Sequence, residues 1–294
     1  MSRPAPEVVT PRVLREWPLP DLQDDKESRG RVLVVGGSRS NPGGVLLAAE
    51  AALRAGAGKI QVVTVASVAV QLAVAMPEMW VRGAAETDDG ELAVEAAEVV
   101  AELAPECEAV LVGPGLGTPR QARELTARIL PELDTTVVLD ALALAAVTED
   151  PSSLSHLEGR SLLTPNLHEL SMTLGWEEAK VRDDPREAAL RLAARTGACV
   201  SSGGATTWVV HPDGRSWKVE MGGPGLGMSG SGDSKAGVVA GLSARGAEPA
   251  QALAWGSYLH ASAGDRLAAA LGSTGFLARE LLQQVPQVLA ELEV

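Results

Sequence analysis

Short apolar runs that end at glycine alternate, along most of the chain, with longer alanine-rich stretches of good helix formers. Residues 31–35 end at Gly36, and the helical stretch that follows, residues 44–55, stops at Gly56. Parallel strands need a helical crossover and are covered on both faces, so they read as continuous apolar runs of this kind. The pattern therefore predicts an α/β fold, with helices on both sides of a mainly parallel sheet.

The same alternation predicts most of the remaining elements. We expect strands at residues 60–65, 109–112, 136–139, 161–163 and 198–201, and helices at residues 91–103, 119–130, 185–196, 234–244, 249–271 and 277–292. One excursion interrupts the alternation, because residues 208–211 and 217–220 flank a Pro-Asp-Gly turn. Two apolar runs around such a turn are typical of a β-hairpin.

The N-terminal segment differs in composition from the rest of the chain. Five of the first twenty residues are proline, and we expect an irregular N-terminal arm over residues 1–28. No linker, low-complexity tract or charge run divides residues 29–294, so we expect one domain there. The whole chain of 294 residues is within the size that a single α/β domain reaches.

Charge and cysteine usage exclude several classes of function. The formal net charge of -13 makes non-specific attraction to nucleic acid or anionic lipid unfavourable, so we expect neither as a partner. The most apolar long window, residues 60–79, is interrupted by polar side chains and does not reach the roughly 20 apolar residues of a bilayer span. Cys107 and Cys199 lie in apolar stretches, which indicates free buried thiols. We therefore expect a cytoplasmic protein without a membrane segment.

The segment from Gly230 to Asp233 carries the strongest local signal of chemistry. Gly230 and Gly232 allow backbone N–H groups to point inward, and the helix expected to follow adds the positive end of its dipole. Such a loop is suited to bind a phosphate. The carboxylate of Asp233 could take a proton from a hydroxyl in line with a phosphoryl group. The alternative is that Asp233 only caps a helix after a flexible loop.

Further glycine-rich and acidic segments accompany this loop. In chain order they are Gly36–Ser38 with Pro42–Gly44, Ala51–Gly58, Gly113–Gly117, Leu139–Ala141, Leu163–Pro165 with Glu169, Gly203 with Thr206, Pro224–Gly225, Gly230–Asp233, and His260 with Ala263–Asp265. In order and spacing this set resembles the ADP/ATP-dependent NAD(P)H-hydrate dehydratases of the ribokinase-like superfamily. The resemblance implies a three-layer α/β/α sandwich, with a single ribokinase-like catalytic domain over residues 29–294 and no room for the epimerase domain that some relatives carry before it.

The resemblance also implies an activity, the repair of NADH or NADPH that has been hydrated on its nicotinamide ring. Hydroxide is a poor leaving group, and transfer of a phosphoryl group from ADP or ATP would turn the ring hydroxyl into a phosphate that can leave. The ring nitrogen would then assist the elimination. Mg²⁺ would bridge the phosphates of the nucleotide, and we expect no metal site formed by side chains alone.

By the same resemblance, particular residues receive roles. Asp233 is similar to the family's catalytic base, and Gly230 and Gly232 help to form the anion hole. The nucleotide-binding segment corresponds to Ser202, Gly203, Gly204, Ala205 and Thr206. The contacts of the hydrated dinucleotide correspond to Gly44, Gly117, Asn166 and Asp233.

Three positions depart from the family pattern. Ser202 stands where the family usually has lysine, and it loses a charged contact worth about 1.5–3 kcal/mol. Asn166 stands in place of histidine and cannot ionise, although it can still form hydrogen bonds. Leu142 replaces the second aspartate of an Asp-Ala-Asp motif and has no polar group. These departures bear on activity more than on the fold.

Lys235 lies two residues after Asp233, where relatives usually carry an apolar side chain and where a cation opposes the helix dipole. One hypothesis is that Lys235 partly replaces the lysine missing at Ser202 and binds the nucleotide. The other is that it is a surface lysine that points outward.

Two further functions remain open from the sequence. A kinase of a small alcohol would use the same Asp233 and anion hole, because phosphoryl transfer without elimination needs the same groups. A paralogue that binds nucleotide without turnover is suggested by Leu142, Asn166 and Ser202. The alanine-rich, weakly charged helices are also compatible with a homo-oligomer, which we expect.

Overall fold

The computed structural model describes residues 4–21, 28–157 and 159–293. Its centre is one ten-stranded sheet with the order β1-β10-β9-β8-β7-β6-β5-β2-β3-β4. The strands are β1 (Glu7–Val8), β2 (Arg31–Val35), β3 (Lys59–Val65), β4 (Met79–Ala84), β5 (Ala109–Val112), β6 (Thr136–Leu139), β7 (Ser161–Leu163), β8 (Cys199–Gly203), β9 (Thr207–Val210) and β10 (Ser216–Val219). Neighbouring strands run parallel except where β9 pairs with β8 and β10. The predicted parallel sheet and the predicted hairpin are thus both confirmed.

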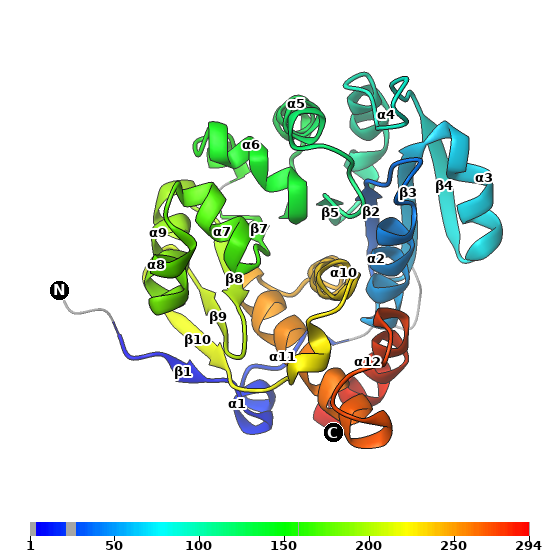
Figure 1. Cartoon of the computed structure of the whole chain (residues 1–294). Helices are drawn as coiled ribbons and strands as arrows, with labels where there is room; N and C mark the ends of the chain where they lie inside the picture. The colour runs from blue at the N-terminus through cyan, green and yellow to red at the C-terminus, as the bar shows by residue number, and fades with distance from the viewer. Residues whose placement is uncertain (1–3, 22–27, 158, 294) are drawn as a thin grey trace.

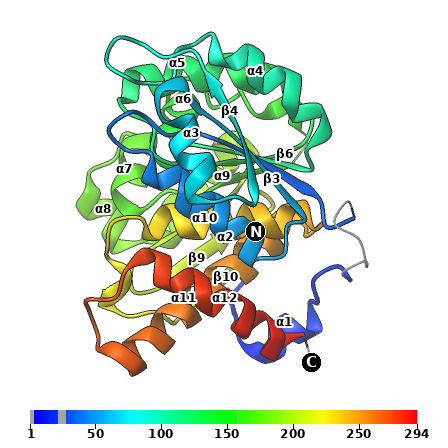
Figure 2. The same ribbon diagram turned by 90° about the vertical axis from the view of Figure 1, so that its right-hand side faces the viewer.

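Helices cover both faces of this sheet and complete three layers, as Figures 1 and 2 show. One face carries α2 (Gly43–Arg54), α10 (Ser231–Ala244), α11 (Pro249–Leu271) and α12 (Ala278–Leu292). The other carries α4 (Ala96–Leu103), α5 (Pro119–Ile129), α6 (Leu144–Glu149), α7 (Leu167–Leu174) and α9 (Pro185–Thr196). The remaining helices are α1 (Pro11–Glu16), α3 (Ala66–Ala75) and α8 (Glu178–Asp183). Each face buries its own apolar cluster of Val, Leu and Ala side chains.

Small residues allow α10 and α2 to pack with their backbones in contact. A Cβ atom at Gly237 would clash with the carbonyl oxygen of Ala48, and one at Gly241 would clash with that of Ala52. These two glycines are four residues apart and therefore lie on one face of α10. This close approach holds the start of α10 beside the start of α2.

Several predicted boundaries differ from those in the structure. The helix predicted from residue 91 begins only at Ala96, because Glu91 and Leu92 form isolated β-bridges with Ser38 and Glu86. The helix predicted from Ser234 begins at Ser231, three residues earlier. Helices α3, α6, α7 and α8 and strand β4 were not predicted at all. For α3 and β4 the cause is visible in the sequence, because residues 66–82 contain no glycine to separate them.

The prediction of an irregular N-terminal arm is wrong for residues 7–16. Strand β1 adds to the sheet by parallel pairing with β10, and Thr10 caps α1, whose Leu14 is fully buried. The Trp17 ring stacks on Trp217 at 5.2 Å. Part of the expected arm, residues 1–3 and 22–27, lies outside the described residues. Proline does not disrupt α1, because Pro11 occupies the first helical position, where no N–H bond is needed.

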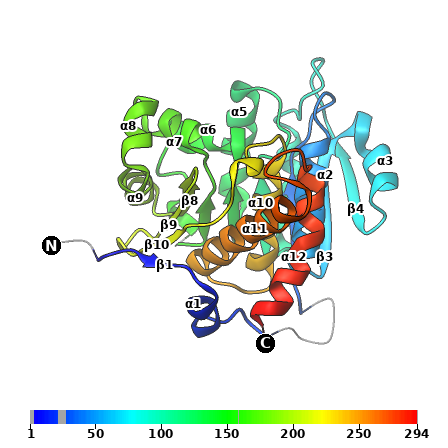
Figure 3. The ribbon, with the colours of Figure 1, turned by 60° about the horizontal axis from the view of Figure 1, so that its bottom comes forward.

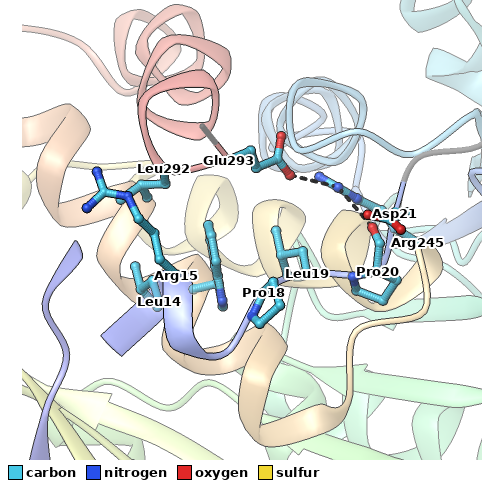
Figure 4. A pocket seen from close by; sticks show the side chains of 10 residues that line it. Leu14, Arg15, Pro18, Leu19, Pro20, Asp21, Arg245, Leu292 and Glu293 are labelled. Carbon is cyan, nitrogen blue, oxygen red and sulfur yellow. Dashed lines mark hydrogen bonds and ion pairs between the residues drawn. The ribbon is translucent and has the colours of Figure 1, made fainter. Parts of the chain in front are cut away.

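Helix α1 lies beside the C-terminal helix α12, as Figure 3 shows. Figure 4 shows the contact, in which Leu14 and Leu19 lie near Leu292 and line a pocket with Arg245. The buried Arg245 guanidinium donates to Glu293 at 2.9 Å and to the carbonyl oxygen of Pro20. The N-terminal segment is therefore packed against α12. Among the described residues, no helix is both long and apolar enough to cross a membrane.

Candidate active site

The parallel strands all end at the same edge of the sheet. Strand β2 pairs in parallel with β3 on one side and with β5 on the other. The strand order reverses there, and open α/β sheets bind ligands outside the carboxyl ends at such a point. The predicted site residues follow these strand ends: Gly117 follows β5, Asn166 follows β7, and Gly203 ends β8. Segments far apart in the sequence are thus brought to one edge.

The start of α10 leaves backbone donors free to meet an anion. Gly230 occupies the N-cap position with a left-handed φ of +86°, and no described side chain caps the helix. The first N–H groups of a helix have no partner within it, and the dipole adds partial positive charge there. Asp233 is the third residue of the helix, so the alternative that it is the N-cap is wrong. The geometry at this terminus suits a phosphate.

A cleft of about 650 Å³ opens at this helix terminus. It lies between the ends of β7 and β8, the loop before α10, and helices α10 and α11. Of the residues predicted to bind ligands, those lining it are Asn166, Gly203, Gly204, Ala205, Gly232 and Lys235. Asp233, Ser202, Thr206, Gly230, Gly44 and Gly117 are not among its described lining residues, although Thr207 is.

Asp233 lies at the boundary between this cleft and two glycine-rich loops. Gly232, its neighbour, lines the cleft. A Cβ atom at Gly44 would lie 2.8 Å from the backbone nitrogen of Gly115 and 3.2 Å from Oδ1 of Asp233. Only a residue without a side chain fits between the loop after β5 and this carboxylate. Burial raises the pKa of Asp233 above its ordinary value, which strengthens it as a base.

Gly117 also lies in a crowded position, where a side chain would clash with the carboxylate of Glu91. The same carboxylate accepts a hydrogen bond from Thr118 at 2.9 Å. The loop after β5 is therefore held against residue 91, which explains why that residue is not helical. Gly117 is part of this loop and lies against Glu91, and Gly44 packs against Gly115 of the same loop.

Ser202 is buried in β8, and its hydroxyl has no hydrogen-bond partner among the described residues. Successive strand residues point to opposite faces, so Ser202 and Ser201 face opposite layers. Ser201 faces α10 and α11, where its hydroxyl is 3.0 Å from that of Ser257. The position that resembles the family's lysine thus places its hydroxyl in the interior.

Lys235 contacts the same strand, β8, from helix α10. Its Nζ donates to the Ser201 hydroxyl at 2.8 Å, and the side chain is partly buried and lines the cleft. The hypothesis of an outward surface lysine is therefore wrong. Burial lowers the pKa of Lys235 to about 8, and the nearby charge of Asp140 opposes this shift.

Asp140 was not predicted as a site residue. It follows β6, is 4% exposed, and accepts a hydrogen bond from the Thr164 hydroxyl at 2.6 Å. Burial raises its pKa to about 7, and the charges of Glu169 and Asp233 add to the shift. Its position directly after a buried strand is the signal that could have identified it. The next residue, Ala141, has φ +49°, a strained conformation for a residue with a side chain.

Asn166 has a structural role that its sequence did not reveal. Its side-chain oxygen accepts from the backbone N–H of Glu169 at 2.9 Å, and the Glu169 carboxylate accepts from the Asn166 N–H at the same distance. This capping box begins α7. The amide nitrogen of Asn166 remains free for a ligand among these contacts. Burial raises the pKa of Glu169.

His260 holds the start of α10 in place. Its Nε2 is 3.0 Å from the hydroxyl of Ser231, the first residue of the helix. Burial and the Lys235 charge lower the pKa of His260 to about 3, so the ring is neutral at physiological pH. Leu142 lies elsewhere, in a separate apolar pocket of about 550 Å³ beside α5, α6 and α7.

Among the described residues, no group of three or more His, Cys, Asp and Glu side chains could hold a metal ion. A carboxylate of the kind that Mg²⁺ prefers is nevertheless present close to Asp233, at Glu169. Mg²⁺ usually retains waters and binds through substrate phosphates plus one or two carboxylates. The donors at this edge fit that mode.

Comparison with known proteins identifies relatives of the whole chain. A family model described as NAD(P)H-hydrate dehydratase matches residues 32–287. The chain is 43% identical over 292 residues to the ADP-dependent (S)-NAD(P)H-hydrate dehydratase of Xanthomonas campestris, which covers 99% of both chains. It is 36% identical over 278 residues to the bifunctional NAD(P)H-hydrate repair enzyme of Moorella thermoacetica, of which it spans 52%.

Solved structures agree on the fold. A ribokinase-like superfamily protein of Enterococcus faecalis matches with a TM-score of 0.83 at 23% identity, covering 97% of this chain and 96% of that one. The ADP/ATP-dependent NAD(P)H-hydrate dehydratase of Bacillus subtilis, co-crystallised with ATP and Mg²⁺, matches with a TM-score of 0.81 at 24% identity, covering 98% and 99%. The fold is thus the predicted ribokinase-like sandwich, and the chain belongs to the NAD(P)H-hydrate dehydratase family.

Proposed function

We propose that this protein restores hydrated NADH or NADPH in a reaction driven by ADP or ATP. The observation that carries the proposal is the position of Asp233, in the first turn of an uncapped helix and against the Gly44 backbone. A base beside a phosphate-binding terminus is what phosphoryl transfer to a hydroxyl needs. Family membership supplies the substrate class.

In the proposed reaction, the oxygen of the ring hydroxyl attacks the terminal phosphoryl group of the nucleotide, and the Asp233 carboxylate accepts the proton of that hydroxyl. The bond from that phosphorus to the bridging oxygen breaks, which leaves the nucleotide shorter by one phosphate. The ring nitrogen then donates electron density, the C–O bond breaks, and a neighbouring ring carbon loses a proton. The products are reduced nicotinamide and inorganic phosphate.

We propose that the nucleotide is bound by Ser202, Gly203, Gly204, Ala205, Thr206, Gly230, Gly232 and Lys235, and the hydrated dinucleotide by Gly44, Gly117, Asn166 and Asp233. Support comes from the cleft, which is lined by Gly203, Gly204 and Ala205 on one side and Gly232 on the other. Mg²⁺ would be held with the phosphates by carboxylate oxygens at this edge and would neutralise charge on the transferred group. Glu169 is the side chain placed for it, since Asp233 serves as the base.

Phosphorus NMR of the reaction mixture separates this proposal from a kinase. With hydrated NADH, Mg²⁺ and ADP, we expect free inorganic phosphate in step with AMP. A phosphorylated substrate that accumulates without elimination would instead identify a kinase. Binding of ADP and ATP with no new phosphorus signal would identify a protein that binds nucleotide without turnover.

We also propose a cytoplasmic location. Cys107 and Cys199 are free and buried, and burial raises the pKa of each thiol to about 12. Thiols of this kind are inert and suit a reducing compartment.

We further propose that the protein forms a homo-oligomer. Helix α3 contains no charged residue and exposes Val70 and Val74, which lie one turn apart. Light scattering on the purified protein should give a mass that is a multiple of the chain mass. The mass of a single chain at all concentrations would contradict the proposal.

A further inference from the structure

The cleft at α10 has an unusual charge balance for a site that holds phosphates. Three carboxyl groups lie close together beside the start of α10, although none is among the described lining residues: Glu169 and Asp233 raise the pKa of Asp140, and Asp233 raises that of Glu169. The chain as a whole carries a net charge of -13. A nucleotide with two or three phosphates therefore approaches a negative surface, and binding requires a cation at the point of contact.

Lys235 is the sole lysine or arginine among the described residues that line the cleft. None of the ion pairs among the described residues involves Lys235, and the charge of Asp140 acts on it only from beyond ion-pair distance. Its Nζ donates one hydrogen bond, to Ser201, which leaves two of its three N–H donors without a described partner. A cation with free donors, inside a cleft of about 650 Å³, is arranged to meet an anion.

The position of the ammonium group is fixed by buried hydroxyls. Ser201 and Ser257 are 0% and 2% exposed, and their hydroxyls are 3.0 Å apart, one on β8 and one on α11. Lys235 joins this pair from α10. Through Ser201, the hydroxyl pair of β8 and α11 thus fixes the end of the Lys235 side chain, which lines the cleft. A lysine ordered in this way loses little further side-chain entropy when a ligand binds.

We infer that Lys235 is the cation that binds the phosphoryl groups of the nucleotide, acting from α10 in place of a lysine at position 202 of β8. This inference deepens the proposed function and rests on it. Helix α10 would then supply both the positive charge of Lys235 and the N–H groups of its first turn to the phosphates. Ser201 is the positioning residue, since it bonds Lys235 without itself lining the cleft.

The arrangement implies a pH dependence of nucleotide binding. The titratable groups whose charges interact with Lys235 are Asp140 after β6 and His260 on α11; Asp233, two residues before it on α10, points to another side of the helix. Burial lowers the pKa of Lys235 to about 8, so its charge is lost as the pH rises through that value. A bound phosphate stabilises the ammonium form. Binding near pH 8.5 should therefore take up protons, and affinity should fall between pH 7 and pH 9.5.

Isothermal titration calorimetry with Mg-ADP and with adenosine tests the inference on the full chain. At pH 7, Lys235→Met should weaken Mg-ADP binding by about 10- to 100-fold and leave adenosine binding unchanged, because only the phosphates meet the ammonium group. Lys235→Arg keeps the charge and should recover most of the affinity. Lys180→Met is the matched control, since Lys180 lies over the Trp176 ring, away from the cleft, and the affinity should not change.

The wild-type protein provides a test that needs no variant. Its Mg-ADP affinity should fall from pH 7 to pH 9.5 toward that of Lys235→Met, whose own affinity should vary less over this range. Equal Mg-ADP affinity of wild type and Lys235→Met at pH 7 would overturn the inference, as would an equal loss for ADP and adenosine. Turnover of hydrated NADH by the wild type is measured separately. Turnover together with Lys235-independent binding would leave the proposed function standing and the inference wrong.

Discussion

At the scale of single residues, the burial of Asp233 has a direct kinetic consequence. Asp233→Asn should reduce kcat by about a hundred- to ten-thousand-fold, the usual contribution of a general base, while nucleotide affinity is kept. Because burial raises the pKa of Asp233, the activity of the wild type should fall on the acid side at a pH above the ordinary value for aspartate. A pH profile of kcat for the wild type and for Asp233→Asn measures both the loss of kcat and the acid-side fall in activity. A variant with unchanged kcat would exclude Asp233 as the base.

Asp140 affects stability in the opposite sense from most carboxylates. Its pKa is raised from about 3.8 to about 7, so the folded state binds a proton that the unfolded state has lost between these values. Stability therefore falls as the pH rises from about 4 to about 7. Asp140→Asn resembles the protonated form and should stabilise the protein by about 2–4 kcal/mol at pH 8 and by little at pH 4.

Urea unfolding at the two pH values measures this effect. The control is Asp150→Asn, because Asp150 is exposed and its hydrogen bonds with Ser152 lower its pKa. That variant should show no gain in stability at pH 8. Equal effects of Asp140→Asn at both pH values would contradict the assignment of a raised pKa.

At the scale of elements, the contact of α10 with α2 depends on glycine. Gly237→Ala should destabilise the protein by about 1–3 kcal/mol, because its Cβ would meet the Ala48 backbone. Gly43→Ala, on α2, is the matched control. A Cβ at Gly43 meets nothing within 4 Å, and alanine favours a helix, so this change should be neutral or stabilising. Thermal unfolding of both variants decides; similar effects would mean that the two helices are not in tight contact.

The sequence predicted the elements that glycine separates and failed where long-range contacts decide. Strand β2 and helix α2 were predicted within one residue, because apolar runs and glycines mark their ends. The start of α10 was placed too late, because glycines usually end helices. Here Gly230 forms the left-handed N-cap and Gly232 lies in the first turn, where few intrahelical bonds are needed.

Part of the cleft lining could be predicted because it consists of glycines that follow strands. Glycines after strands are visible in a sequence, and several of those predicted line the cleft. The pairing of Asp140 with Thr164 joins the ends of two strands, and the contact of Lys235 with Ser201 joins a helix to a strand. Such contacts depend on the order of strands in the sheet, which no local pattern encodes. The binding and catalytic roles of all the predicted site residues stay predictions.

At the scale of the whole molecule, the N-terminal segment belongs to the packed structure. Leu14→Ala should destabilise the protein by about 2–5 kcal/mol, because Leu14 is fully buried under α12. Arg12→Ala, on the exposed face of α1, should change stability by less than about 0.5 kcal/mol. Chemical denaturation gives both values. A Leu14→Ala variant as stable as Arg12→Ala would show that the segment is a loose arm after all.

The site beside Asp233 is proposed to carry out nucleotide-dependent dehydration. The most direct measurement is the return of absorbance in the reduced-nicotinamide band when the protein is mixed with hydrated NADH, Mg²⁺ and ADP or ATP. We predict recovery with the wild type, none without nucleotide, and almost none with Asp233→Asn. Failure of the folded wild type to restore absorbance with either nucleotide, although it binds them, would contradict the proposed dehydration.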